Sequence, residues 1–369
     1  MEAPSGRRKR SSPKAAAIRV EEDDALLPGL PCHLSELCLA GVPHRLLFSV
    51  CHPWRRFLYS QFPAPFALYV FLSTGDWETT SIEFFTLDPL PSTWQALPPP
   101  PSDPPLHLIH RHPSFLSRKL PIQALSVCNH LVLVAGTTQE FYPALSQPLV
   151  FHPGTAEWFH GPPFHAPRRW CAAGAIGNTV YLASGYGAKY SPTVARSMEQ
   201  WRLTPKRKHW KWEALTGLSD GRFSREAVGG VGWRGKLYVV NMKGSGVKEG
   251  VMYDPQNDAW QAMPEGMVAG WNGPAAAMDE EVMYAVDERR GVLMEYEAEA
   301  DCWVDLIKLP ELVQAEQIAA GRGRVCVVSG TGERIIVVDV LTRPPRVWIE
   351  ELPLGRQFVG VHILPGMRL

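Results

Sequence analysis

The chain has 369 residues, with 37 Lys and Arg side chains against 37 Asp and Glu side chains, so its formal net charge is zero. This balance excludes a global electrostatic affinity for nucleic acid or for an anionic membrane surface. No apolar run reaches the roughly 18 residues that a membrane span needs, and we recognise no signal peptide. The seven cysteines are odd in number and include no CxxC pair, so we expect no disulfide framework, metal site or cofactor. Such a chain fits the reducing nucleus or cytoplasm.

Residues 1–25 are polar and small, and they cannot bury a core, so we expect a disordered tail. The tail contains the basic run "GRRKR" at 6–10 and an acidic cluster at 21–24. The basic run resembles a short nuclear-import signal. A solvated tail with no targeting role is the equally weighted alternative.

Residues 26–60 change composition and predict a module of three short helices. Leu34, Leu37 and Cys38 follow helical i, i+3, i+4 spacing, which places them on one face. Pro31 suits the start of the first helix. Pro53 would cost a hydrogen bond inside a continuous helix, and it could open the third. A module of about 30 residues is too small to be very stable alone, so we expect it to complete its core on a partner.

The octet "YDPQNDAW" at 253–260 recurs along the rest of the chain. Each copy has a large apolar or aromatic residue seven positions before a Trp, and four copies carry Pro at the third position. The other copies are 87–94, 151–158, 203–210 and 296–303, with a looser one ending at Trp348. A repeat of about 40–50 residues is the size of one four-stranded propeller blade. We therefore interpret the octet as a packing element and not as a site.

The repeats predict a mainly β fold, a six-bladed propeller over residues 66–369. Five segments each supply four strands, separated by Gly and Pro turns. These segments are 124–162, 170–215, 227–264, 274–310 and 318–353. Residues 66–98 supply only three strands, and the strand 357–365 at the other end of the chain has no other partner. We expect the two to pair, which closes the ring and removes its open edges.

Alignment of the repeats brings several Arg and Trp residues together just before the inner strands, around one mouth of the expected channel. Loops at such a place commonly carry function, and Arg and Trp are enriched in interface hot spots. The predicted substrate-binding residues are Arg168, Arg169, Trp170, Arg225, Trp271, Asn272, Gln317 and Arg356. They suggest an acidic or aromatic ligand. An ordinary solvated rim is the alternative.

Two further segments have a structural interpretation beside a functional one. The histidine-bearing "HLIHRHP" at 107–113 lacks a carboxylate or Cys at ligand spacing, so a surface loop is favoured over a metal site. The proline run at 98–105 could bind a partner as a polyproline helix, but a stiff connector between blades is favoured.

The pattern "LPxxLxELCL…VP…LL…SVCxxWRRFL" at 30–58 resembles an F-box, and with the repeats the chain resembles a plant F-box/kelch-repeat protein. The resemblance covers residues 26–369 and implies that the module at 26–60 binds the Skp-type adaptor of a cullin–RING ubiquitin ligase. It implies adaptor contacts by Leu30, Pro31, Leu34, Leu46, Val50, Cys51 and Trp54. Some of these could instead hold the helices together. Cys32 departs from the family pattern, in which an acidic residue commonly follows the Leu-Pro pair.

The resemblance also implies a role without catalysis. The propeller mouth would hold a protein substrate for ubiquitination by proximity. An adaptor-independent interaction scaffold is the alternative. A metal-dependent catalytic propeller is a remote one, because the aligned mouth residues include no histidine.

Overall fold

The computed structural model describes most of the chain between residues 26 and 366. The described residues are 26–27, 29–39, 42, 46–47, 50–51, 54, 66–74, 82–89, 92–101, 122–138, 142–219, 221–224, 228–241, 248–353 and 355–366. The chain divides into two units, one of residues 1–65 with 89–93 and one of residues 66–88 with 94–369. The predicted tail at 1–25 lies outside the described residues.

The N-terminal unit contains helix α1 (Cys32–Leu39), which begins directly after Pro31. The Pro31 carbonyl accepts hydrogen bonds from the backbone N–H of Leu34 and Ser35, both at 3.0 Å. Residues 46–47, 50 and 54 are also helical, but much of the remaining module lies outside the described residues, so the three-helix arrangement stays a prediction. The Trp54 indole donates to the Leu26 carbonyl at 2.5 Å, which joins the two ends of the described module.

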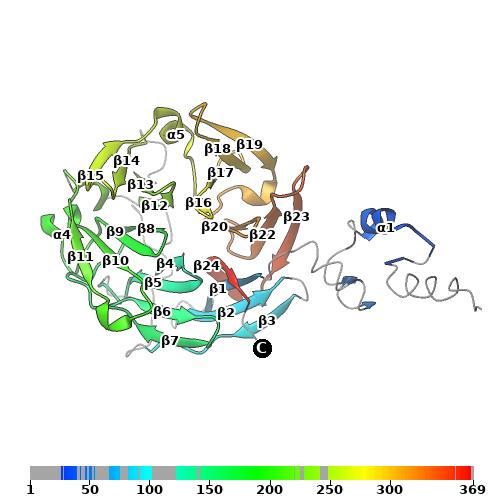
Figure 1. The fold of residues 1–369 in the computed structure, drawn as a ribbon, viewed down its shortest axis with the longest axis horizontal. Helices are drawn as coiled ribbons and strands as arrows, with labels where there is room; N and C mark the ends of the chain where they lie inside the picture. Colours follow the sequence, from blue (N-terminus) through cyan, green and yellow to red (C-terminus); the bar gives the residue numbers. More distant parts are fainter. Residues whose placement is uncertain are drawn as a thin grey trace, which may run out of the picture. The chain divides into compact units, whose positions relative to one another are not determined.

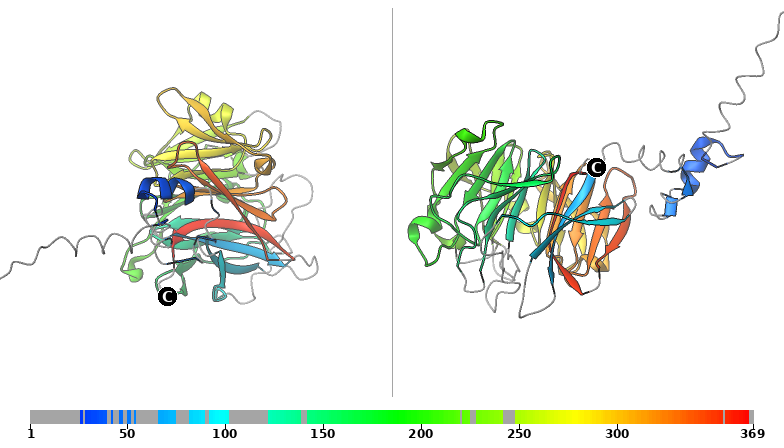
Figure 2. Two further views of the ribbon diagram at one scale, coloured as in Figure 1. Left: turned by 90° about the vertical axis from the view of Figure 1, so that its right-hand side faces the viewer. Right: turned by 90° about the horizontal axis from the view of Figure 1, so that it is seen from below.

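The second unit is a β-propeller in which the described strands form six four-stranded sheets around a central axis (Figure 1). Two further views show the sheets side by side around the ring (Figure 2). The predicted six-bladed, mainly β fold is therefore confirmed. From the axis outward, the first blade consists of β24 (Arg356–Pro365), β1 (Phe66–Thr74), β2 (Ile82–Asp88) and β3 (Thr93–Ala96).

The remaining blades follow in chain order, each with its first strand at the axis. The second and third blades are β4 (Ile122–Val127), β5 (His130–Gly136), β6 (Leu149–His152) and β7 (Glu157–His160), then β8 (Ala172–Ile176), β9 (Thr179–Ala183), β10 (Met198–Arg202) and β11 (Trp212–Leu215). The fourth is β12 (Val228–Trp233), β13 (Lys236–Asn241), β14 (Gly250–Asp254) and β15 (Ala259–Ala262). The last two are β16 (Ala275–Met278), β17 (Val282–Asp287), β18 (Val292–Glu297) and β19 (Cys302–Lys308), then β20 (Gln317–Gly321), β21 (Arg324–Val328), β22 (Arg334–Asp339) and β23 (Arg346–Glu351).

Short helices occupy some of the connections. They are α4 (Pro192–Arg196), α5 (Glu265–Gly270) and the 3₁₀ helices η1 (Arg207–His209), η2 (Arg222–Ser224) and η3 (Pro310–Leu312). Within the described part of the chain, no helix is both long and apolar enough to cross a membrane.

The ring closes where strands from the two ends of the propeller sequence meet. β24 pairs antiparallel with β1, with Tyr69 opposite His362 and Val70 opposite Val361. The Tyr69 hydroxyl donates to the Pro365 carbonyl at 3.0 Å. Because β24 occupies the inner position of this blade, the blade has four strands and the inner edge of β1 is paired.

The recurring octet forms a hairpin that joins neighbouring blades. Tyr253 lies directly opposite Trp260, with ring centroids 5.2 Å apart. The Tyr253 hydroxyl donates to Asp258, and Asp254 accepts the Gln256 N–H at 3.0 Å within the turn. The Trp260 indole donates to the Thr216 carbonyl, just after the outer strand of the preceding blade, at 2.8 Å. The predicted packing role is confirmed, and a polar contact between blades is added to it.

In the third blade the register differs from the predicted one. The Trp opposite the third strand is Trp212, which faces Trp201, and not Trp210. The 3₁₀ helix η1 lengthens this hairpin, so the paired Trp comes two residues later than the octet spacing predicts. Trp212 makes the contact between blades, donating to the Pro162 carbonyl at 3.0 Å, whereas Trp210 donates to Thr204 within its own hairpin.

Small residues line the channel because neighbouring inner strands approach closely. A methyl group added at Gly232 in β12 would overlap the carbonyl oxygen of Ala175 in β8. Only glycine fits at such an approach. This explains the small-residue composition of the predicted inner strand in the fourth blade.

Candidate functional site

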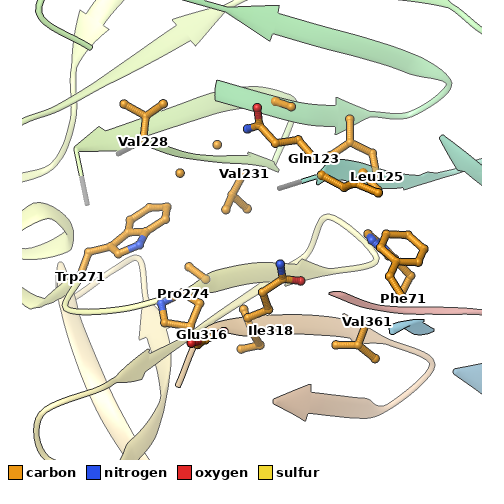
Figure 3. Close-up of a pocket in the computed structure, with 18 residues that line it drawn as sticks. Phe71, Gln123, Leu125, Val228, Val231, Trp271, Pro274, Glu316, Ile318 and Val361 are labelled. Atoms are coloured by element: carbon orange, nitrogen blue, oxygen red, sulfur yellow. The ribbon is translucent and has the colours of Figure 1, made fainter. Parts of the chain in front are cut away.

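A cavity of about 180 Å³ lies in the channel near the ends at which the inner strands begin (Figure 3). All six blades contribute to its wall, either through strands or through the connections that lead into them. The wall consists of Phe71, Ile122, Gln123, Ala124, Leu125, Ala173, Val228, Gly229, Gly230, Val231, Trp271, Pro274, Ala275, Glu316, Gln317, Ile318, Val361 and His362. A concave, mixed apolar and polar site of this kind is the usual place for ligand binding.

Two glutamine side chains of the wall connect neighbouring blades. Gln123 in β4 donates through Nε2 to the Cys171 carbonyl, and its Oε1 accepts the Cys171 N–H at 2.9 Å. Gln317 in β20 donates through Nε2 to the Val359 carbonyl in β24 at 2.6 Å. Each amide therefore satisfies backbone groups within or directly before an adjacent inner strand, which fixes the position of its own side chain.

The two aromatic walls are also held in place. The Trp271 indole donates to the Gly273 carbonyl at 3.1 Å, and its ring centroid lies 6.2 Å from that of Trp303. Phe71 packs edge-to-face on Phe84, with centroids 5.0 Å apart. Both side chains are almost fully buried, so the surface that they expose to the cavity is small.

His362 lies deeper in the channel and borders two cavities, the one described above and another of about 520 Å³ at the opposite end. Its Nδ1 is 3.3 Å from the Ser126 hydroxyl. The His362 side chain is half-buried: part of it borders the channel, and protein atoms enclose the rest. This burial lowers the pKa of His362 to about 4, so the imidazole is neutral at neutral pH.

Of the predicted mouth residues, Trp271 and Gln317 line the cavity. Arg168 does not, and its side chain is fully buried. It donates to Glu199, to the Ser184 carbonyl at 3.1 Å and to the Ser197 hydroxyl at 2.7 Å. This corrects the interpretation of Arg168 as a residue exposed at the mouth, because its guanidinium compensates a buried carboxylate and anchors the loop before β8.

Arg169 and Trp170 form an aromatic cluster beside the cavity wall. The Arg169 guanidinium lies 4.0 Å from the Trp170 ring centroid and 4.9 Å from that of Tyr186. Arg169 and Tyr186 are joined by reciprocal backbone hydrogen bonds of 2.9 Å. Trp170 has φ +53°, which is unusual for a bulky residue and marks a position fixed by its surroundings. Arg169 is also buried, so the cluster organises this loop.

The last three predicted residues lie away from the cavity wall or outside the described part. Arg356 is paired with Glu83 at 2.9 Å and lies over the Phe85 ring. Asn272 is half-buried, and its carbonyl accepts the Glu288 N–H at 3.2 Å. Arg225 lies outside the described residues, as does the histidine-bearing segment 107–113. Contact of any of these residues with a substrate stays a prediction.

The predicted adaptor-binding residues differ in exposure within the N-terminal unit. Leu30 and Leu34 are each 40% exposed, Leu46 is 52% exposed and Val50 is 56% exposed. Cys51 and Trp54 are half-buried, and Pro31 is exposed. Leu47 and Leu39, which the prediction did not include, are buried and supply the packing inside this unit.

Sequence reasoning missed Gln123, Phe71 and His362 as wall residues. One signal was present, since Gln123 and Gln317 both stand at the start of an inner strand otherwise composed of small or apolar residues. Among the described residues, no group of three or more His, Cys, Asp or Glu side chains is arranged to hold a metal ion.

Comparison with known proteins adds a whole-chain match. The chain is 45% identical over 382 residues to the F-box/kelch-repeat protein SKIP25 of Arabidopsis thaliana, covering 99% of this chain and 94% of that protein. The chain belongs to the F-box/kelch-repeat family. The F-box/kelch-repeat protein SKIP4 and the F-box protein AFR, both from Arabidopsis thaliana, are 23% and 24% identical. These matches cover 89% and 67% of this chain and 88% and 65% of those proteins. No protein-family model matches the chain.

Proposed function

We propose that this F-box/kelch-repeat protein is the substrate-recognition subunit of an SCF-type cullin–RING ubiquitin ligase. In this proposal residues 1–25 are a tail, residues 26–60 form a three-helix F-box, and residues 66–369 form the propeller. The F-box binds a Skp-type adaptor, and through it the cullin and RING subunits. The propeller holds a protein substrate and performs no catalysis itself, because the ligase acts through proximity.

The observation that carries the proposal is the exposure of apolar side chains in the N-terminal unit. Five large apolar residues between positions 30 and 50, namely Leu30, Leu34, Leu37, Leu46 and Val50, are each at least 40% exposed. Exposed apolar residues gathered in so short a segment are typical of a surface that a partner covers. This supports the expectation that the module completes its core on another protein.

The cysteines support a nuclear or cytoplasmic location. Six of the seven cysteines, Cys38, Cys51, Cys128, Cys171, Cys302 and Cys326, are free thiols. Free thiols are expected in a reducing compartment.

The adaptor interaction is tested by co-purification of the full chain with a Skp-type adaptor. The double variant Leu30→Ala with Pro31→Ala should lose the adaptor, because interfaces of small helical modules depend on a few apolar anchors. The control Glu36→Ala changes an exposed polar residue on α1 and should retain it. Thermal unfolding of the propeller should be the same in all three proteins. Adaptor binding that survives the double variant would instead favour the adaptor-independent scaffold.

A further inference from the structure

The size of the cavity near the inner-strand starts limits what can enter it. Its volume of about 180 Å³ is slightly larger than the roughly 150 Å³ of an engineered apolar cavity that binds benzene. It can therefore take one aromatic ring but not a folded segment or a helix. The side chains of Phe71, Trp271, Val231 and Ile318 line this space, which favours an apolar or aromatic group (Figure 3).

The charge of the wall limits the ligand further. Among the described residues of the wall, no Arg or Lys is present, and Glu316 is the one formally charged side chain. A phosphate or carboxylate placed here would lose its hydration without gaining a cation from these residues, and it would meet the Glu316 carboxylate. The wall is thus suited to an uncharged side chain. This differs from the acidic ligand that the predicted ring of arginines suggested.

The deeper end of the cavity is polar. His362 borders it as a neutral imidazole, and its Nδ1 lies 3.3 Å from the hydroxyl of Ser126, which lines the cavity at the opposite end. An aromatic side chain with a hydrogen-bonding tip can satisfy this end while its ring contacts the apolar wall. Because Gln123, Gln317 and Trp271 are already fixed by hydrogen bonds to neighbouring backbone, little of the wall needs ordering when a ligand binds.

We propose that this cavity is a specificity pocket for one uncharged aromatic side chain, with tyrosine as the best fit, of a peptide held at the propeller mouth. The proposal rests on the proposed function, in which the propeller binds a protein substrate. The pocket excludes phosphotyrosine and acidic side chains. Substrates would accordingly be chosen by an exposed aromatic residue, and phosphorylation of that residue would prevent recognition.

The test uses p-cresol, the side-chain analogue of tyrosine, with the full chain and ligand-observed NMR. Two variants on the inner strand β16 form a matched pair. Ala275 lines the proposed pocket and also borders the cavity at the opposite end, whereas Ala277, two residues further on, lines only the cavity at the opposite end. Ala275→Leu fills the pocket and should weaken p-cresol binding by about tenfold or more, while Ala277→Leu should leave it unchanged. Thermal unfolding of both variants shows that each is folded.

A second comparison tests the charge selectivity. The parent chain should bind p-cresol and show no saturable binding of p-cresyl phosphate. The proposal is overturned by absent p-cresol binding, by a p-cresol affinity that Ala275→Leu leaves unchanged, or by preference for the phosphate. Co-purification with the adaptor does not involve this pocket. If the parent chain binds the adaptor but not p-cresol, the aromatic pocket alone is rejected. If it binds p-cresol but not the adaptor, the ligase role alone is rejected.

Discussion

The indole of Trp303 donates a hydrogen bond of 3.0 Å to the carbonyl of Met267, in the connection that follows the outer strand of the preceding blade. Trp158, Trp212 and Trp260 make the corresponding bond to Pro98, Pro162 and Thr216. The same residue type therefore joins four successive pairs of blades. Since each blade is a separate sheet, such contacts couple the sheets in addition to the apolar packing between them.

Replacement of Trp303 tests this coupling. Trp303→Phe keeps an aromatic ring but removes the donor, which leaves the Met267 carbonyl without this hydrogen bond. We expect the free energy of unfolding to fall by about 1–2 kcal/mol, the value of one hydrogen bond whose partner stays behind. Urea unfolding measures the change. An unchanged free energy would show that the indole N–H contributes nothing to joining the blades.

Asp301 should make stability depend on pH. The Tyr296 hydroxyl donates to its carboxylate at 2.6 Å, and the N–H groups of Gly266 and Met267 donate at 2.9 Å each. These bonds hold the pKa of Asp301 below its ordinary value. A carboxyl whose pKa is lower in the folded state stabilises the fold fully above its unfolded pKa of about 3.9. That contribution is lost as the pH falls through the folded pKa.

The predicted result is a melting temperature that falls below about pH 4 in the parent, with a weaker pH dependence in Asp301→Asn. Tyr296→Phe removes one of the donors and should weaken the dependence only in part. Melting temperatures recorded between neutral and acidic pH measure both effects. A parent and an Asp301→Asn variant with equal slopes would contradict this role for Asp301.

The buried pair of Arg168 and Glu199 should be important for stability. The Arg168 side chain is fully buried and that of Glu199 is 5% exposed. Arg168→Met leaves the carboxylate without its main partner, so we expect a loss of about 3–5 kcal/mol. Adding Glu199→Leu should recover much of that loss, because an apolar pair avoids the buried charge. Chemical unfolding tests this. The His165 Nδ1 lies 2.9 Å from Glu199 Oε2, so a small effect of Arg168→Met would mean that His165 or water compensates the carboxylate.

The blade register could be predicted from the sequence because it depends on short-range spacing. Tyr253 and Trp260 lie opposite each other in one hairpin, so a separation of seven residues records a local geometry. The same spacing failed at Trp210, where η1 lengthens the hairpin and Trp212 takes the position. Sequence reasoning could not detect this, because "HWKW" offers two tryptophans and the spacing alone selected the first.

The candidate site was less predictable because it depends on long-range contacts. Arg168 was expected at the mouth, but its burial depends on Glu199, which lies 31 residues further along the chain. Phe71 and His362 meet in the cavity wall only because β24 pairs with β1, which brings together the two ends of the propeller sequence. No local pattern around either residue distinguishes it from other apolar or polar strand residues.

Thiol labelling provides a test of the packing around the inner strands. Cys171 is fully buried between the second and third blades, and burial raises its pKa to about 11. Burial raises the pKa of Cys326 in β21 as well. The thiolate is the reactive form, so both residues should resist iodoacetamide at neutral pH in the folded protein. Cys302 is exposed on β19 and should be alkylated readily. Mass spectrometry before and after unfolding in urea identifies the modified residues. Rapid labelling of Cys171 without urea would show that the inner strands separate there, and it would contradict the blade contact that Gln123 maintains.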